Sequence, residues 1–173
     1  ADLWNSGRTA SDQSVLVEYG GKDLESRSKC WWKVRVWDKN GRASAWSGPG
    51  YFELGFLAVD DWDGTWIRSE KTFTGKEHPG LMFRKEFALE GEIESARLYI
   101  SSLGLYEAEI NGVKVGDQVL TPGWTSYDHR LQYQTYDVTH LIRGGDNVLG
   151  AMLGDGWYRG YMGHRGHHNL YGD

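Results

Sequence analysis

One pair of residues, Asn111-Gly112, constrains the fold of this chain more than any other feature of its sequence. Both residue types tolerate positive φ, which the two central positions of a type I′ turn require, and the twist of that turn matches the strands it joins. Apolar residues alternate with polar ones on both sides of the pair, at Leu98, Ile100, Tyr106, Ala108, Ile110, Val113 and Val115. Residues 96–160 are therefore predicted to form antiparallel β-structure.

The composition agrees with an all-β chain. The 173 residues include 24 Gly, 9 Trp and 10 Tyr but only 3 Pro, which is typical of many short strands joined by glycine turns. The net charge is −5 and no basic block occurs, so we expect no nucleic-acid partner. No apolar run approaches the length of a membrane span and the first residues show no signal peptide, so we expect no membrane partner. Cys30, the single cysteine, is predicted to be a small core residue.

The segment Cys30 to Asp38, CWWKVRVWD, reads as one strand. Alternation places Trp32, Val34 and Val36 on one face, and Trp31, Lys33, Arg35 and Trp37 on the other. A D-x-x-G turn, an x-S-x-W-S segment and a strand around 51–54 follow. This order resembles the last two strands of a fibronectin type III-like sandwich, which needs about seven strands. We expect residues 1–56 to be the C-terminal part of such a domain, completed by something absent or folded as an open sheet.

Residues 57–173 are predicted to form a second domain. It begins with a linker that carries an acidic, tryptophan-containing turn at 59–67, and a strand follows at 81–89. An aspartate cluster suggests calcium, but the turn lacks the D-x-D-x-D-G frame and the closing glutamate of an EF-hand. A solvated turn is the favoured interpretation.

Several phrases of the second domain carry a family resemblance. In order along the chain they are residues 104–107, 110–112, 120–125, 133–139 and 153–160, the last reading LGDGWYRG. Together they are similar to the N-terminal non-catalytic region of bacterial α-L-rhamnosidases of glycoside hydrolase family 78, and the fibronectin-like segment fits the same domain order. The resemblance implies an antiparallel jelly-roll, galactose-binding-like β-sandwich for residues 57–173, lacking its last strands, in a chain truncated at both ends.

The same resemblance implies that catalysis lies elsewhere. In the family an inverting reaction is carried out by an (α/α)₆ barrel further along the polypeptide, and this chain has no long amphipathic helices from which to build one. Glycoside hydrolysis needs two opposed carboxylates, and no acid in this sequence stands in a frame that singles it out. We therefore predict no catalytic residue here. The expected partners are the barrel of the same polypeptide and rhamnose-containing saccharides.

Sugar recognition uses aromatic rings against the pyranose and short polar side chains for its hydroxyls. Trp124, Tyr127, Trp157 and Tyr158 are the candidate platforms, and Asn111, Asp128, Asp155 and Arg159 the candidate hydrogen-bonding residues. Some family members hold rhamnose through a calcium ion, but here Ile110 stands before Asn111 where an aspartate would favour calcium. No other cofactor is expected.

Three interpretations stay open: a domain that packs against the barrel and shapes the approach to it, which we favour; an autonomous rhamnose- or polysaccharide-binding module; and a fragment hydrolase. His164, His167 and His168 in the C-terminal segment favour a glycine-rich loop over a zinc site. Saccharide degradation slightly favours the periplasm or the cell exterior. A cytoplasmic enzyme that acts on imported oligosaccharides is also compatible with the sequence.

Overall fold

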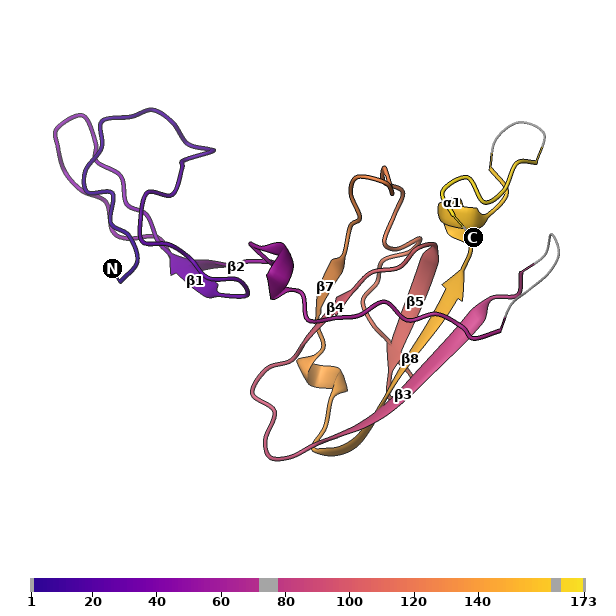
Figure 1. Ribbon diagram of the computed structural model, residues 1–173. Helices are drawn as coiled ribbons and strands as arrows, with labels where there is room; N and C mark the ends of the chain where they lie inside the picture. The colour runs from indigo at the N-terminus through magenta and orange to yellow at the C-terminus, as the bar shows by residue number, and fades with distance from the viewer. Residues whose placement is uncertain (1, 72–77, 163–165, 173) are drawn as a thin grey trace. The chain divides into compact units, whose positions relative to one another are not determined.

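The computed structural model describes residues 2–71, 78–162 and 166–172, and its regular secondary structure consists almost entirely of antiparallel strands (Figure 1). The all-β prediction is confirmed. The chain divides into two compact units, Ala1–Trp66 and Ile67–Asp173, called unit 1 and unit 2 below.

Unit 1 contains a single pair of strands. Strand β1 (Lys29–Trp32) runs antiparallel to β2 (Gly50–Glu53), and a short 3₁₀ turn, η1 (Val59–Asp61), follows. Within the described part of unit 1, Cys30 is the one fully buried side chain, which agrees with its predicted packing role. Unit 1 therefore has very little hydrophobic core of its own.

The strand predicted from Cys30 to Asp38 is shorter in the structure, because β1 ends at Trp32. Beyond that point the backbone amides of Val34 and Val36 donate to the hydroxyls of Ser47 and Ser44, at 3.0 and 3.1 Å. The amides of the same two serines donate back to the carbonyls of Val34 and Val36, each at 2.8 Å. Serine oxygens thus take the place of strand carbonyls, so the segment stays paired without forming a regular ladder.

The acidic turn of unit 1 is held by hydrogen bonds. The carboxylate of Asp61 accepts from the Ser26 hydroxyl and from the Ala58 amide, the latter at 2.9 Å. These donors, the Ser26 hydroxyl first, lower the pKa of Asp61. The turn is therefore held by its own backbone and by a side chain 35 residues earlier in the chain, and its solvated character stays a prediction.

Unit 2 is a two-layer arrangement of antiparallel strands. One sheet has the order β3-β8-β5-β6, and the second consists of β4 and β7 (Figure 1). The strands are β3 (Leu81–Leu89), β4 (Arg97–Ile100), β5 (Leu105–Ile110), β6 (Val113–Lys114), β7 (Gln134–Asp137) and β8 (Gly145–Gly154), with the 3₁₀ turn η2 (Thr139–Leu141) after β7 and the single-turn helix α1 (Gly156–Arg159) after β8.

Strand β5 carries the core between the two layers. Its inward residues Tyr106, Ala108 and Ile110 are buried, together with Val115 and Val138, against apolar side chains of β4, β7 and β8. Burial, followed by the contact with Tyr136, raises the pKa of the Tyr106 phenol well above its usual range. The alternating pattern of the sequence predicted this inward face.

Two local predictions in unit 2 are confirmed. The β5–β6 hairpin turns at Asn111 and Gly112, with φ of 54° and 79°, as a type I′ turn requires. The strand predicted at 81–89 is β3. The carboxylate of Asp137 also accepts from the backbone amide of Thr139 at 3.1 Å, beside the start of η2, whose N-cap residue is Val138.

Candidate functional site

The four predicted aromatic platforms come together beyond the end of β8. The indoles of Trp124 and Trp157 stack with ring centroids 6.1 Å apart and planes 6° from parallel. Tyr127 meets Tyr158 edge-on at 5.3 Å. These rings come from a loop near residue 125 and from α1, which the fold brings to the same end of the sheet.

A fifth ring, Tyr171, joins the four. It lies 4.9 Å from Tyr127 and 6.5 Å from Tyr158, and the indole nitrogen of Trp124 donates to its hydroxyl at 3.4 Å. We call these five residues the aromatic cluster. Burial, and next the neighbouring Tyr171 phenol, raise the pKa of Tyr127, which keeps that phenol protonated. Tyr171 was not predicted from the sequence.

A charged group lies at the same end of β8. Asp155 and Arg159, both predicted, face each other with Oδ1 and Nε 3.4 Å apart. His78, which the sequence did not single out, is buried between them: its Nδ1 accepts from Arg159 Nη2 at 3.0 Å and lies 3.4 Å from Asp155 Oδ2. A small cleft lined by these three side chains and by Leu81, Leu103 and Leu153 opens here.

Two glycines allow this corner to form. Gly104 has φ of +117°, and a Cβ on it would lie 2.3 Å from the carbonyl oxygen of Gly154. Gly156 has φ of +54°, and a Cβ there would lie 2.6 Å from Leu105. Only glycine fits these close, left-handed positions, so the chain can leave β8 and turn at once into α1.

The remaining two predicted residues lie outside this constellation. Asp128 is exposed in the turn beside Tyr127. Asn111 lies near the other end of β8. Its backbone amide donates to the carbonyl of Val148, and its side-chain oxygen accepts from the Val148 amide. Asp155, in contrast, follows the last residue of the strand. Seven strand residues correspond to about 23 Å. A direct sugar contact by Asn111 or Asp128 stays a prediction.

The corner retains unused hydrogen-bonding capacity. Thr125 Oγ1 is buried and has no hydrogen-bond partner among the described residues, and Arg159 Nε has no hydrogen bond there beyond its 3.4 Å ion-pair contact with Asp155 Oδ1. Buried polar atoms are normally satisfied, so such atoms mark places where a further polar group can bind. The aromatic cluster offers apolar contacts and these atoms offer hydrogen bonds. The corner therefore suits contact with a second surface that carries both apolar and polar groups.

Metal ligands do not gather in the described ranges, where no group of three or more His, Cys, Asp or Glu side chains occurs. Of the three C-terminal histidines, His164 lies outside the described residues, the carbonyl of His167 accepts from Met162 at 2.8 Å, and His168 lies 5.2 Å from the ring of Tyr161. A calcium site stays a prediction. The helices of the described chain are all too short or too polar to cross a bilayer.

Family models match both units. Residues 91–173 match the α-L-rhamnosidase N-terminal domain, and residues 1–58 match the Rha78A-like N-terminal immunoglobulin domain.

Curated relatives are α-L-rhamnosidases. One from Formosa agariphila is 41% identical over 169 residues, which are 94% of this chain and 18% of the relative. One from Alteromonas sp. is 38% identical over 92% of this chain and 18% of its own length. The chain thus spans about a fifth of the length of these two relatives.

Solved structures of α-L-rhamnosidases also match this chain. The α-L-rhamnosidase from Aspergillus terreus is 39% identical with a TM-score of 0.88, covering 99% of this chain and 21% of that protein. The enzyme from Dictyoglumus thermophilum is 37% identical with a TM-score of 0.81, covering 90% of this chain and 19% of that protein. Residues 1–58 and 91–173 therefore belong, in this order, to the Rha78A-like N-terminal immunoglobulin domain and to the α-L-rhamnosidase N-terminal domain, which form the N-terminal, non-catalytic region of these relatives.

Proposed function

We propose that these residues are part of a longer enzyme that hydrolyses terminal α-L-rhamnosides with inversion at a separate (α/α)₆ domain, and that unit 2 supports and orients that domain. The length of the relatives and the activity for which they are named support the first half of the proposal. The aromatic cluster, next to the His78–Asp155–Arg159 group, is the observation that carries the second half.

The residue types at this corner are typical of the centre of a protein–protein interface. Tryptophan, tyrosine and arginine dominate the residues that contribute most to protein–protein contacts, especially where they are clustered and surrounded by polar groups. Trp124 is 55% exposed although it belongs to a five-ring cluster. An exposed indole fixed in place by a stacked neighbour and a hydrogen bond loses little freedom when a second surface covers it.

Saccharide binding is a second candidate, and one observation favours it. The outer face of Trp124 is open, and an exposed aromatic face is what the apolar side of a pyranose covers. Since the other face of Trp124 is taken by Trp157, this indole offers a single platform. A single platform supports a contributing subsite for rhamnosides better than an independent binding module.

Trp124→Ala in the longer enzyme tests the proposal. We expect a loss of about 2 kcal/mol at the contact with the catalytic domain, the scale of an interface hot spot. It should appear as a lower melting temperature of the catalytic domain and as reduced hydrolysis of p-nitrophenyl rhamnoside. Trp66→Ala is the matched control, because Trp66 is an exposed tryptophan, at 65%, outside the cluster.

The 173-residue chain separates the alternatives. Under the interface proposal it neither hydrolyses the rhamnoside nor binds rhamnose in calorimetry. Saturable rhamnose binding that disappears in Trp157→Ala would establish the saccharide-binding role instead. Turnover by the chain alone, abolished by one carboxylate substitution, would overturn both.

A further inference from the structure

Positive charge is concentrated in one segment of unit 1. Residues 27–47 contain six Lys and Arg residues and one acidic residue, Asp38, whereas the whole chain has a net charge of −5. The carboxylate of Asp38 accepts from the backbone amides of Asn40 and Arg42, each at 2.8 Å, so it is used within its own turn. No two of the six cations are adjacent in sequence, so they form no continuous block, and the fold is needed to gather them on one face.

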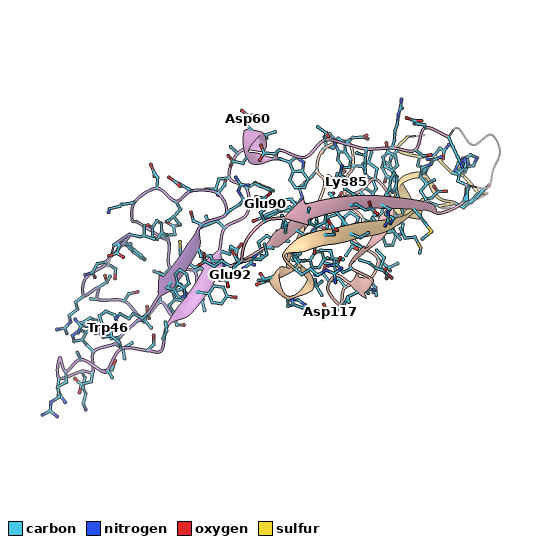
Figure 2. The ribbon with its side chains drawn as sticks, turned by 90° about the horizontal axis from the view of Figure 1, so that it is seen from below. Trp46, Asp60, Lys85, Glu90, Glu92 and Asp117 are labelled. Carbon is cyan, nitrogen blue, oxygen red and sulfur yellow. The ribbon has the colours of Figure 1, made fainter. Side chains whose placement is uncertain are left out.

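Three cations alternate with two indoles along one face of unit 1. The guanidinium of Arg35 lies over Trp46 at 4.6 Å and over Trp37 at 5.0 Å. The Lys33 ammonium lies 5.0 Å from the centre of the Trp46 ring, and the Arg8 guanidinium lies 5.6 Å from that of Trp37. Trp46 is in the irregular part of unit 1, away from the β1–β2 pair (Figure 2). We call these five residues the cationic ladder.

Two open rings continue this face. Alternation along the chain places Trp31 on the same side as Lys33, and Tyr51 lies opposite Trp31 in the β1–β2 register. The Trp31 and Tyr51 rings lie 6.4 Å apart, and each residue is 66% exposed. From Trp31 to Trp37 an extended chain covers about 20 Å. The face is therefore long enough for an extended ligand to contact rings and cations together.

The three cations of the ladder are exposed and retain free hydrogen-bond donors. Within the described residues, none of their side chains forms an ion pair or donates a hydrogen bond. A guanidinium that stacks on an indole keeps the N–H groups at its edge available for a carboxylate. Stacking also restricts the side chain, so less freedom is lost when a ligand binds. The ladder is thus a set of positioned cations that lack an anionic partner in the described chain.

We propose that the cationic ladder, together with Trp31 and Tyr51, binds an acidic polysaccharide whose sugars carry carboxylate groups. The cations bind the carboxylates, with the guanidinium groups of Arg8 and Arg35 suited to two parallel hydrogen bonds each. The open rings cover the apolar face of a pyranose. The choice of a saccharide rests on the proposed function, because an enzyme that cleaves terminal rhamnosides acts on saccharide chains.

The spacing of the cations favours a saccharide over a nucleic acid. Lys33 and Arg35 are two residues apart on one face, which corresponds to about 7 Å. The phosphates of a single nucleic-acid strand are about 3.4 Å apart, and so dense a polyanion is disfavoured by a chain with a net charge of −5. A polysaccharide that carries one carboxylate per sugar is a sparser polyanion.

Calorimetric titration of the longer enzyme with polygalacturonate tests this inference. The fully methyl-esterified polymer is the matched control ligand, because it has the same sugars without the carboxylates. We expect saturable binding of polygalacturonate that weakens as salt is added, and no binding of the ester. The measurement needs no turnover, so binding can fail while rhamnoside hydrolysis is intact, and hydrolysis can fail while binding is intact.

Variants of Lys33 assign the binding to the ladder. Lys33→Gln should weaken binding of polygalacturonate about fivefold, the upper range for one exposed ion pair, and should make its salt dependence shallower. Lys33→Arg keeps the charge and should bind within about twofold of the unchanged enzyme. Lys85→Gln is the matched control, because Lys85 is an exposed cation on β3 in unit 2 and its loss changes the net charge equally (Figure 2). Trp31→Ala, which leaves every cation in place, should also weaken binding.

Three results would overturn the proposal directly: equal binding of polygalacturonate and its methyl ester, equal losses in Lys33→Gln and Lys85→Gln, or no binding at all. Tighter binding of dextran sulfate than of polygalacturonate would show that sulfate esters are recognised instead of carboxylates. Tighter binding of a single-stranded oligonucleotide, lost in Lys33→Gln, would make the partner a nucleic acid. If the 173-residue chain binds polygalacturonate and the longer enzyme does not, other parts of the polypeptide cover the ladder, and the proposed ligand is wrong.

Discussion

Replacing Asn147 by leucine is expected to destabilise unit 2 by about 3–5 kcal/mol, because the change leaves several buried polar groups without partners. Asn147 is fully buried in β8. Its carboxamide donates to the carbonyls of Arg143 and Gly145, at 2.7 and 2.9 Å. Its oxygen accepts from the Arg143 amide at 3.1 Å and from the side chain of Asn111 at 2.9 Å. Leucine has a similar volume but satisfies none of these four groups.

Urea unfolding of Asn147→Leu, Asn111→Gly and the double variant measures this network. Glycine accepts the positive φ of Asn111, so Asn111→Gly removes the side chain without backbone strain. Because the two carboxamides share a hydrogen bond, the double variant should lose less stability than the sum of the single changes, by about 1 kcal/mol. Strict additivity, or a loss below 1 kcal/mol for Asn147→Leu, would contradict the structural role assigned to this network.

The second large effect is expected for Gly104→Ala, which should cost about 3 kcal/mol or more. Alanine at φ of +117° is strained, and its Cβ would lie 2.3 Å from a backbone oxygen that cannot move without shifting β8. The substitution should separate the start of β5 from the end of β8. Because α1 begins two residues after Gly154, the aromatic cluster should lose its geometry with the same change.

Gly112→Ala is the matched control for Gly104→Ala. Gly112 also has positive φ, +79°, but a Cβ there would meet nothing within 4 Å, so only the conformational cost of about 1 kcal/mol applies. Thermal unfolding of the two variants compares the stability lost through backbone strain alone, in Gly112→Ala, with the stability lost through backbone strain and a steric clash together, in Gly104→Ala. Equal losses would show that β5 and β8 can separate freely, contrary to the close approach in the structure.

Local signals in the sequence were sufficient for the framework of unit 2. The Asn111-Gly112 turn and the alternation in β3 and β5 each depend on neighbours a few residues away, and each is found in the structure. The end of β1 at Trp32 could not be anticipated, because it depends on hydroxyls supplied by Ser44 and Ser47 from the next segment.

The candidate site was only partly accessible from the sequence. Trp124 and Trp157 could be named as aromatic residues, but their stacking depends on two loops that meet only in the folded sheet. Neither His78 nor Tyr171 carries a local signal, since their contacts reach across 77 positions to Asp155 and 47 to Trp124. Long-range contacts of this kind are set by the topology of the sheet and leave no periodic pattern in the sequence.

The β5–β6 turn has a further consequence for the chemical lifetime of the protein. Asparagine followed by glycine readily loses ammonia, when the glycine nitrogen attacks the side-chain carbonyl. Here the carboxamide of Asn111 is held by the carbonyl of Leu141, the amide of Val148 and the side chain of Asn147. The attack therefore requires the turn to open first. The rate of deamidation at Asn111 would thus report how often the hairpin opens locally.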